Sequence, residues 1–166
     1  ATLSNCTKLD SKVFTEIKKF NGLPHRSEFV AKINGITFIN DSKATNVGAA
    51  IAAMNSFFSD RKGVLIAGGL FKGGNIYQFA KAIEQLCHTV VLIGSSAKNI
   101  EDILSGRVFC KVASSLRSAV QEAGILAETG DTVLLAPACS SLDMFRNYED
   151  RGDAFKHAVT QWGQNG

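Results

Sequence analysis

Short apolar runs alternate with helix-like segments along most of this chain, and this alternation constrains its fold more than any other feature. Runs of aliphatic and β-branched residues, typical of buried strands, occupy residues 64–67, 90–93, 108–112 and 132–136. Segments with helical periodicity precede and follow them, at residues 46–57, 76–86, 97–104, 115–128 and 148–162. Near-continuous apolar strands joined by helices are typical of a parallel sheet that is covered on both faces. The pattern predicts an α/β fold, a Rossmann-like three-layer sandwich with a mostly parallel sheet.

The region before residue 46 follows a different pattern. Residues 28–33 and 36–39 read as two short alternating strands joined by Asn34-Gly35, which is the strongest short-range signal for a β-hairpin. We expect this hairpin at or near one edge of the sheet. Upstream, apolar residues that share one face predict a short helix at 11–20, and residues 1–10 are polar and expected to fray. Pro24 disfavours helix, so residues 23–26 are interpreted as a linker.

Composition excludes several classes of protein. The chain has 166 residues, 45% hydrophobic and 20% charged, which fits one globular domain with a real core. The net charge of +3 is small and no basic stripe carries interleaved aromatics, so nucleic-acid binding is not expected. The apolar runs are too short to span a bilayer, and no signal peptide opens the chain. Four cysteines without Cys-x-x-Cys spacing are interpreted as reduced thiols of a cytoplasmic protein, with neither zinc nor a disulfide framework.

Polar loops follow the predicted strands, where ligands bind in sheets of this kind. The richest is Asn-Asp-Ser-Lys-Ala-Thr-Asn at residues 40–46, which leads directly into a helix. Further loops lie at 68–75, with two glycine pairs around Lys72, at 94–96, and at 137–143, with Ser140-Ser141. A helix start offers free N–H groups and a positive dipole end, which suit an anion. We expect these loops to converge on one crevice that binds an anionic ligand.

Simpler interpretations of the same residues stay open. Asp, Ser, Thr and Asn are ordinary capping residues, and Ser140 or Ser141 could cap a following helix. The glycines at 68–74 could serve only tight turns, since this loop has neither the Walker A order nor the Gly-x-Gly-x-x-Gly spacing. No Ser/His/Asp set and no His-Glu-x-x-His motif is present. The residues indicate anion binding without acid–base chemistry of their own.

Five segments together resemble the bacterial Mur ligases in their order and spacing, and most resemble the family's D-glutamate-adding branch. They are Gly-Leu-Pro-His-Arg at 22–26, residues 40–46, Gly68-Gly69 with Lys72, Pro-Ala-Cys-Ser-Ser-Leu-Asp at 137–143 with Phe145, and residues 147–152. The likeness runs from about residue 12 to 162 and covers only the third, C-terminal domain of that family. It implies that residues 1–22 are the tail of a central ATPase domain with its hinge, and that residues 23–166 are the amino-acid-binding ligase domain. An alternative is a natural stand-alone domain.

The resemblance also implies a reaction and a set of contacts. In peptidoglycan synthesis, and thus in cell-wall growth, cell shape and division, the full-length enzyme uses ATP and Mg²⁺ to join D-glutamate to UDP-MurNAc-L-alanine. Without the N-terminal and central domains, this chain is expected to be inactive and to hold neither catalytic residues nor a metal. By the resemblance, Arg26 meets the ATP phosphates, Asp41 the nucleoside and Lys43 the phosphate region. D-glutamate is assigned to five residues: Thr45, Lys72, Ser141, Leu142 and Tyr148.

Two positions depart from the family pattern. Leu70 and Phe71 stand where homologues usually carry an Asp between the glycine pair and the lysine, so an acidic partner for Lys72 is absent. Tyr148 stands where a Phe is usual, which adds a hydroxyl. Two alternatives therefore accompany the D-glutamate assignment. One is the matching domain of another Mur or folylpolyglutamate-type ligase, and the other is a binding module without catalysis.

Overall fold

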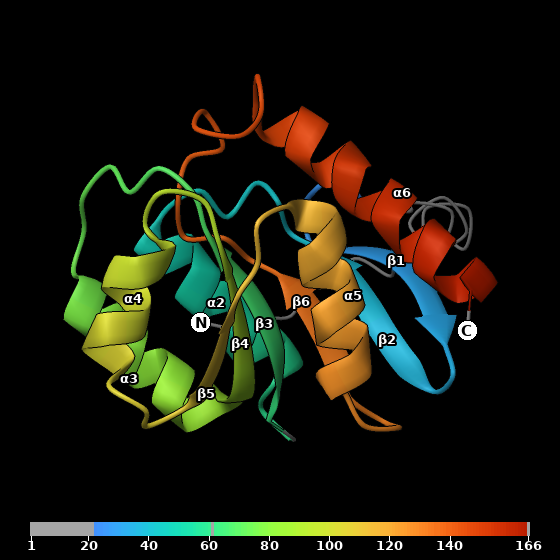
Figure 1. Cartoon of the computed structure of the whole chain (residues 1–166), viewed down its shortest axis with the longest axis horizontal. Helices are drawn as coiled ribbons and strands as arrows, with labels where there is room; N and C mark the ends of the chain where they lie inside the picture. The colour runs from blue at the N-terminus through green and yellow to red at the C-terminus, as the bar shows by residue number, and fades with distance from the viewer. Residues whose placement is uncertain (1–21, 61, 166) are drawn as a thin grey trace, which may run out of the picture.

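A six-stranded sheet forms the centre of the structure, and its strand order is β1-β2-β6-β3-β4-β5 (Figure 1). The computed structural model describes residues 22–60 and 62–165. Strands β2 to β6 run parallel to one another, and β1 runs antiparallel to β2. The strands are β1 (Glu28–Ile33), β2 (Ile36–Asn40), β3 (Gly63–Gly68), β4 (Cys87–Ile93), β5 (Phe109–Val112) and β6 (Thr132–Leu135).

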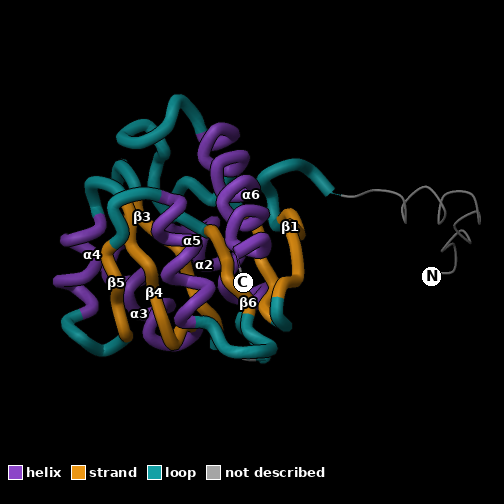
Figure 2. Tube along the Cα trace, turned by 45° about the vertical axis from the view of Figure 1, so that its right-hand side comes forward, coloured by secondary structure: helices purple, strands orange, loops and turns teal. Residues whose placement is uncertain are grey.

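Helices cover both faces of this sheet, as the two views in Figures 1 and 2 show. Helices α2, α3 and α4 pack on one face, and α5 and α6 pack on the other. Their bounds are α2 (Val47–Phe57), α3 (Ile76–Leu86), α4 (Ala97–Leu104), α5 (Leu116–Leu126) and α6 (Tyr148–Asn165). In the described part of the chain, no helix is long and apolar enough to cross a membrane. The predicted three-layer α/β sandwich is confirmed.

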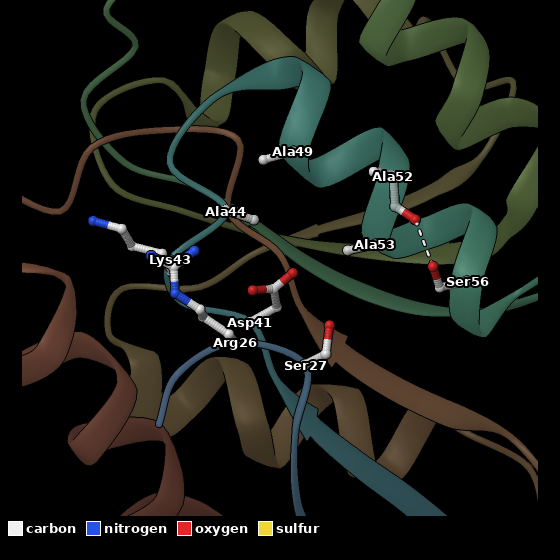
Figure 3. A pocket seen from close by; sticks show the side chains of 9 residues that line it. All are labelled: Arg26, Ser27, Asp41, Lys43, Ala44, Ala49, Ala52, Ala53 and Ser56. Atoms are coloured by element: carbon white, nitrogen blue, oxygen red, sulfur yellow. Dashed lines mark hydrogen bonds between the residues drawn. The ribbon is translucent and has the colours of Figure 1, made fainter. Parts of the chain in front are cut away.

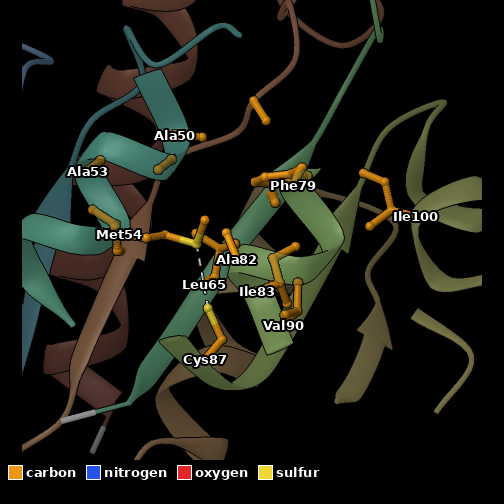
Figure 4. Close-up of a cluster of buried hydrophobic side chains, with 14 of the residues drawn as sticks. Ala50, Ala53, Met54, Leu65, Phe79, Ala82, Ile83, Cys87, Val90 and Ile100 are labelled. Atoms are coloured by element: carbon orange, nitrogen blue, oxygen red, sulfur yellow. Dashed lines mark hydrogen bonds between the residues drawn. The ribbon is translucent and has the colours of Figure 1, made fainter. Parts of the chain in front are cut away.

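The continuous apolar runs are explained by burial on both faces of the strands. In β3, Leu65 belongs to the core beneath α2 and α3, whereas Val64 and Ile66 belong to the core beneath α5 and α6. Figure 4 shows the first core, where Met54 and Phe79 extend from facing helices toward Leu65. Burying one such side chain stabilises the fold by about 1.5–3 kcal/mol. Strands β2, β3, β4 and β6 therefore each contribute side chains to both cores.

The hairpin prediction is confirmed, including its place at the edge. Strand β1 is one of the two edge strands of the sheet, and among the described strands it pairs only with β2. Asn34 and Gly35 have φ angles of 51° and 81°, so both central residues of the turn are left-handed. That is the requirement of the tight turn that Asn-Gly favours.

Two element ends and the burial of one strand differ most from the sequence-based expectation. Strand β4 begins at Cys87, directly after α3, because Thr89 pairs with Val64 although it interrupts the apolar run. Strand β5 was expected to be a buried strand, and this is wrong: Phe109 and Val112 are exposed, because β5 is the outer strand of the sheet. Helix α6 extends to Asn165, three residues beyond the expected end. The helix expected at 11–20 and the polar segment 1–10 lie outside the described residues.

The cysteines within the described residues are free thiols, as expected. Cys87 is buried, with its Sγ 3.7 Å from Met54 Sδ, and burial raises the pKa of its thiol. Cys110 is half-buried and packs against the core beneath α2 to α4. Both fill apolar space, whereas Cys139 lies in the loop after β6. Cys6 lies outside the described residues.

Candidate functional site

The loops that follow β2, β3 and β6 meet at the carboxyl edge of the sheet, the upper edge in Figure 1. Leu70 and Ser140 exchange two main-chain hydrogen bonds of 2.9 and 3.0 Å, which join the loop after β3 to the loop after β6. The Ala138 N–H donates to the Ala44 carbonyl at 2.9 Å, which joins the loops after β6 and β2. The expectation that distant polar loops converge at one edge is confirmed.

Glycine is required where these loops touch. Gly68 and Gly69 have φ angles of 110° and 126°, which side chains rarely adopt. A Cβ at Gly69 would lie 2.4 Å from the Ser140 carbonyl oxygen, and one at Gly68 would lie 2.1 Å from the Ile93 carbonyl oxygen. Close backbone approach, and not only turn formation, explains this glycine pair.

A pocket of about 280 Å³ opens between the three loops, and we call it the Lys72 pocket. It contains all five residues that the resemblance assigns to D-glutamate. Its lining is Lys43, Thr45, Lys72, Ser140, Ser141, Leu142, Asn147 and Tyr148. The sequence-based assignment is therefore geometrically consistent, and the binding role itself stays a prediction.

The chemistry of the Lys72 pocket favours a small anion. Two ammonium groups line it, from Lys43 and Lys72, and none of its lining residues is acidic. Among the described residues, no carboxylate lies within 4 Å of the Lys72 ammonium, which is exposed. Ser141 is buried at 3% exposure and offers a hydroxyl from the pocket wall. Charge-assisted hydrogen bonds from such groups replace the water that a carboxylate loses on binding.

A second pocket of about 300 Å³ lies beside it, and we call it the Asp41 pocket (Figure 3). Arg26, Asp41 and Lys43, the three residues that the resemblance assigns to ATP, all line it. The rest of its lining is Ser27, Ala44, Ala49, Ala52, Ala53 and Ser56. Figure 3 shows the Asp41 carboxylate between Ser27 and the small side chains of α2. Two cations beside a flat wall of alanines suit a phosphate chain attached to a flat ring.

Burial raises the pKa of Asp41, although the Ser27 N–H and the Arg26 guanidinium both act to lower it. Among the described residues, no ion pair joins Asp41 to Lys43, although their spacing would allow a surface pair. The Asp41 carboxylate thus remains a hydrogen-bond acceptor that faces the pocket.

A buried arginine beneath the pockets was missed by the sequence analysis. Arg151 of α6 is 1% exposed, and its three hydrogen bonds reach both neighbouring loops. Its Nε and Nη2 donate to Ser42 Oγ and Ser42 O at 3.0 and 2.8 Å, and its Nη1 donates to Cys139 O at 3.0 Å. Burial lowers the pKa of Arg151 to about 10, so the guanidinium is still charged at neutral pH. The only sequence signal is its place in the segment 147–152, in which the resemblance assigns a role to Tyr148 but none to Arg151.

His25 was interpreted as a linker residue, and the structure corrects this. His25 is 6% exposed and packs against Gly152 of α6, so residue 25 belongs to the folded domain. The Asn40 amide nitrogen lies 3.1 Å from His25 Nδ1 and donates to Glu28 Oε2 at 3.0 Å. Asn40 Oδ1 accepts from the Ser42 N–H at 3.1 Å. The side chains of His25 and Asn40 thus fix the first turn of the loop after β2.

The capping role considered for Ser140 and Ser141 is wrong. The Ser141 carbonyl accepts from the N–H groups of Met144 and Phe145 in a turn, and no helix begins there. Helix α6 begins at Tyr148, where Asn147 Oδ1 accepts from the Asp150 N–H. In contrast, Asn46 caps α2 as its residue type suggests. The described residues contain no group of three or more His, Cys, Asp or Glu side chains that could hold a metal ion.

Comparison with known families gives one match to this chain. A family model described as "Mur ligase, glutamate ligase domain" matches residues 25–139. The UDP-N-acetylmuramoylalanine–D-glutamate ligase of Saccharophagus degradans is 49% identical over 146 residues, which cover 87% of this chain and 32% of that protein. The same ligase of Legionella pneumophila is 45% identical over 149 residues, which cover 89% and 33%. The chain spans about a third of the length of these curated relatives.

Solved structures share the fold at low sequence identity. The UDP-N-acetylmuramate-alanine ligase of Thermotoga maritima superposes with a TM-score of 0.63 at 17% identity, over 92% of this chain and 33% of that one. The folylpolyglutamate synthase of Mycobacterium tuberculosis, complexed with ADP, gives a TM-score of 0.64 at 15% identity, over 91% and 36%. At such identities the likeness shows the fold alone.

Proposed function

Because this chain belongs to the Mur ligase family, through its glutamate ligase domain, we propose that it is the D-glutamate-holding part of an ATP-dependent ligase. The complete enzyme would join D-glutamate to UDP-MurNAc-L-alanine during peptidoglycan synthesis in the cytoplasm. Residues 1–22 would then be the tail of the central ATPase domain with its hinge, and residues 23–166 the C-terminal domain. Cell-wall growth, cell shape and division would depend on that reaction.

The observation that carries this proposal is the composition of the Lys72 pocket. D-glutamate brings two carboxylates, and removing them from water is costly unless charged or hydroxyl donors replace that water. Lys72 and the hydroxyls of Thr45 and Ser141 are such donors, and they converge from three separate loops. Leu142 and Tyr148 would cover the aliphatic part of the ligand.

The Asp41 pocket would take ATP. Arg26 and Lys43 would bind the phosphates, and the Asp41 carboxylate would accept hydrogen bonds from the nucleoside hydroxyls. Asp41 is the only carboxylate that lines this pocket, so the described residues do not fit a Mg²⁺ site by themselves. We therefore derive no step through Mg²⁺, which the rest of the ligase would have to hold. A folylpolyglutamate synthase of which this fold forms about a third was solved with ADP, which is consistent with nucleotide use by ligases that contain this fold.

The two pockets adjoin at Lys43, which suits a reaction between an amino acid and an acyl phosphate. ATP would phosphorylate the acceptor carboxylate, the D-glutamate amine would attack the acyl carbon, and phosphate would leave. Holding the amine in place turns a bimolecular attack into an effectively unimolecular one. This chain would position reactants and contribute no acid–base residue. It would be inactive alone, and phosphate release from ATP above background would contradict that.

Calorimetric titration of amino acids into the chain tests the proposal. We expect weak binding of D-glutamate, preferred over L-glutamate, L-alanine and L-lysine. Lys72→Met should weaken it by about 10- to 100-fold, because a hydrogen bond to a charged group contributes about 1.5–3 kcal/mol. Lys81→Met on the exposed side of α3 is the matched control and should change nothing. Equal affinity of Lys72→Met and the wild type would remove Lys72 from the site.

The same titration separates the alternatives. A preference for another amino acid would indicate the matching domain of a neighbouring Mur or folylpolyglutamate-type ligase, whose fold this chain shares. Binding of D-glutamate by a chain that restores no ligase activity when it replaces the corresponding part of a complete relative would favour a non-catalytic binding module.

A further inference from the structure

Lys43 is the one residue that lines both pockets described above. Its main chain is fixed from two sides: its N–H donates to the His25 carbonyl at 3.0 Å, and its carbonyl accepts from the Thr45 N–H at 2.7 Å. The backbone thus places Lys43 at the boundary between the pockets. The position of its long side chain has to be set by something else.

An aromatic ring contacts the Lys43 side chain directly, whereas the Glu149 carboxylate interacts with it only through its charge, from beyond ion-pair distance. The ammonium nitrogen lies 3.9 Å from the centroid of the Tyr148 ring, well inside the range of a cation–π contact. Among the described residues, no carboxylate lies within 4 Å of this ammonium. A paired carboxylate would compete with an anionic ligand for the lysine. A ring face attracts the cation more weakly and leaves its N–H groups free to donate.

The Tyr148 ring is itself anchored. The interaction between its hydroxyl and the neighbouring Glu149 carboxylate raises the pKa of Tyr148 and lowers the pKa of Glu149. The Tyr148 carbonyl accepts from Ser42 Oγ at 2.8 Å, and Ser42 is tied in turn to Arg151. A phenol that donates to a carboxylate has a more electron-rich ring, so the contact to Lys43 should be strengthened.

We propose that Tyr148 is a positioning residue for Lys43, so that a side chain of the Lys72 pocket sets anion binding in the neighbouring Asp41 pocket. Tyr148 lines only the Lys72 pocket. Its effect on the other pocket must therefore pass through the lysine that it holds. The identity of the two ligands, D-glutamate and ATP, rests on the proposed function, whereas the contact between Lys43 and Tyr148 does not.

A double-mutant cycle on ATP affinity tests this. Tyr148→Leu should weaken ATP binding by about two- to fivefold, the size of an exposed cation–π contact, and Tyr148→Phe should stay within about twofold of the wild type. Lys43→Met should weaken it further, and adding Tyr148→Leu to that variant should have no additional effect. Tyr77→Leu, at the exposed tyrosine of α3, is the matched control. Additive losses in the double variant would overturn the proposal, because they would indicate a general structural effect.

NMR of the Lys43 side chain gives a readout that needs no ligand. A ring face shifts nearby protons upfield, so the Lys43 ε-methylene signal should be upfield in the wild type and in Tyr148→Phe. It should return to an ordinary position in Tyr148→Leu and should move when ATP is added to the wild type. An unshifted wild-type signal, or one that ATP leaves unchanged, would overturn the proposal. An absence of D-glutamate binding would contradict the proposed function but would leave the contact between Lys43 and Tyr148 unaffected.

Discussion

The two pockets differ in how the chain builds them. The residues that line the Asp41 pocket all lie between residues 26 and 56, in the segment before β1, the loop after β2 and helix α2. The Lys72 pocket comes from separate stretches at 43–45, 72, 140–142 and 147–148. The first depends mainly on local structure, and the second exists only when distant loops are held together. Changes at the junctions between loops should therefore impair the Lys72 pocket more than the Asp41 pocket.

Replacement of Arg151 should cause the largest losses of stability and of ligand binding. In Arg151→Met the carbonyls of Ser42 and Cys139 lose their buried donor, and each unsatisfied buried group costs about 1–3 kcal/mol. We expect the free energy of unfolding, measured by urea denaturation, to fall by roughly 3 kcal/mol or more. D-glutamate binding should fall more than ATP binding, since only the Lys72 pocket uses the loop after β6.

Arg117→Met, at an exposed arginine of α5, is the matched control for Arg151→Met and should stay within about 0.5 kcal/mol of the wild type. Equal losses of D-glutamate and ATP affinity in Arg151→Met would show that the two pockets do not differ in the way described. An unchanged urea midpoint would show that the buried guanidinium does not hold the loops together.

Alanine substitution at either of two loop glycines should cause a loss of stability of intermediate size. Gly69 and Gly73 both have positive φ, 126° and 109°, so alanine should cost about 1–3 kcal/mol of backbone strain at either position. Only at Gly69 would the new Cβ also meet a backbone oxygen, 2.4 Å away, whereas nothing lies within 4 Å at Gly73. Gly69→Ala should thus destabilise more than Gly73→Ala and should weaken D-glutamate binding while sparing ATP. Equal unfolding free energies of the two variants would exclude a role for close approach.

Asp41→Asn should give the smallest change, confined to the Asp41 pocket. The pKa of Asp41 is raised in the folded protein, so the folded state binds this proton more tightly than the unfolded state does. As pH rises from below 3.8 through the raised pKa, the charged carboxylate therefore costs stability. Asn removes that cost, and we expect the Tm at pH 7 to rise by about 1–2 °C. This gain should vanish near pH 3, and calorimetric scans at both pH values check it.

Asp41→Asn should at the same time weaken ATP binding and leave D-glutamate binding unchanged. A lower Tm at pH 7 would show that the contacts of the ionised carboxylate with the Ser27 N–H and Arg26 outweigh its burial. A change in D-glutamate affinity would show that a substitution in the Asp41 pocket also affects the Lys72 pocket.

The sequence predicted mainly those features of the fold that depend on neighbouring residues in the chain. Periodicity and the Asn34-Gly35 turn predicted the three layers and the edge hairpin, because both signals lie in neighbouring residues. The loop residues assigned by resemblance do come together at two adjoining pockets. Their ligands remain to be tested.

The features that the sequence did not predict depend on strand order and on long-range contacts. The exposure of β5 depends on its place at the end of the sheet, which no local pattern specifies. The burial of His25 and Arg151 depends on α6 crossing over the loop after β2. A polar side chain in a loop or on an amphipathic helix is usually exposed, so their residue types gave no sign of burial.

The strand order has a consequence for synthesis of the protein. Strand β6, the last of the described strands, lies between β2 and β3, and within the described sheet it alone joins the β1–β2 hairpin to the other strands. Residue 135 must therefore emerge from the ribosome before β6 can pair with β2 and β3 and join the two halves of the sheet. Until then both halves expose an unpaired strand edge, which is where a nascent chain is open to aggregation and to chaperones.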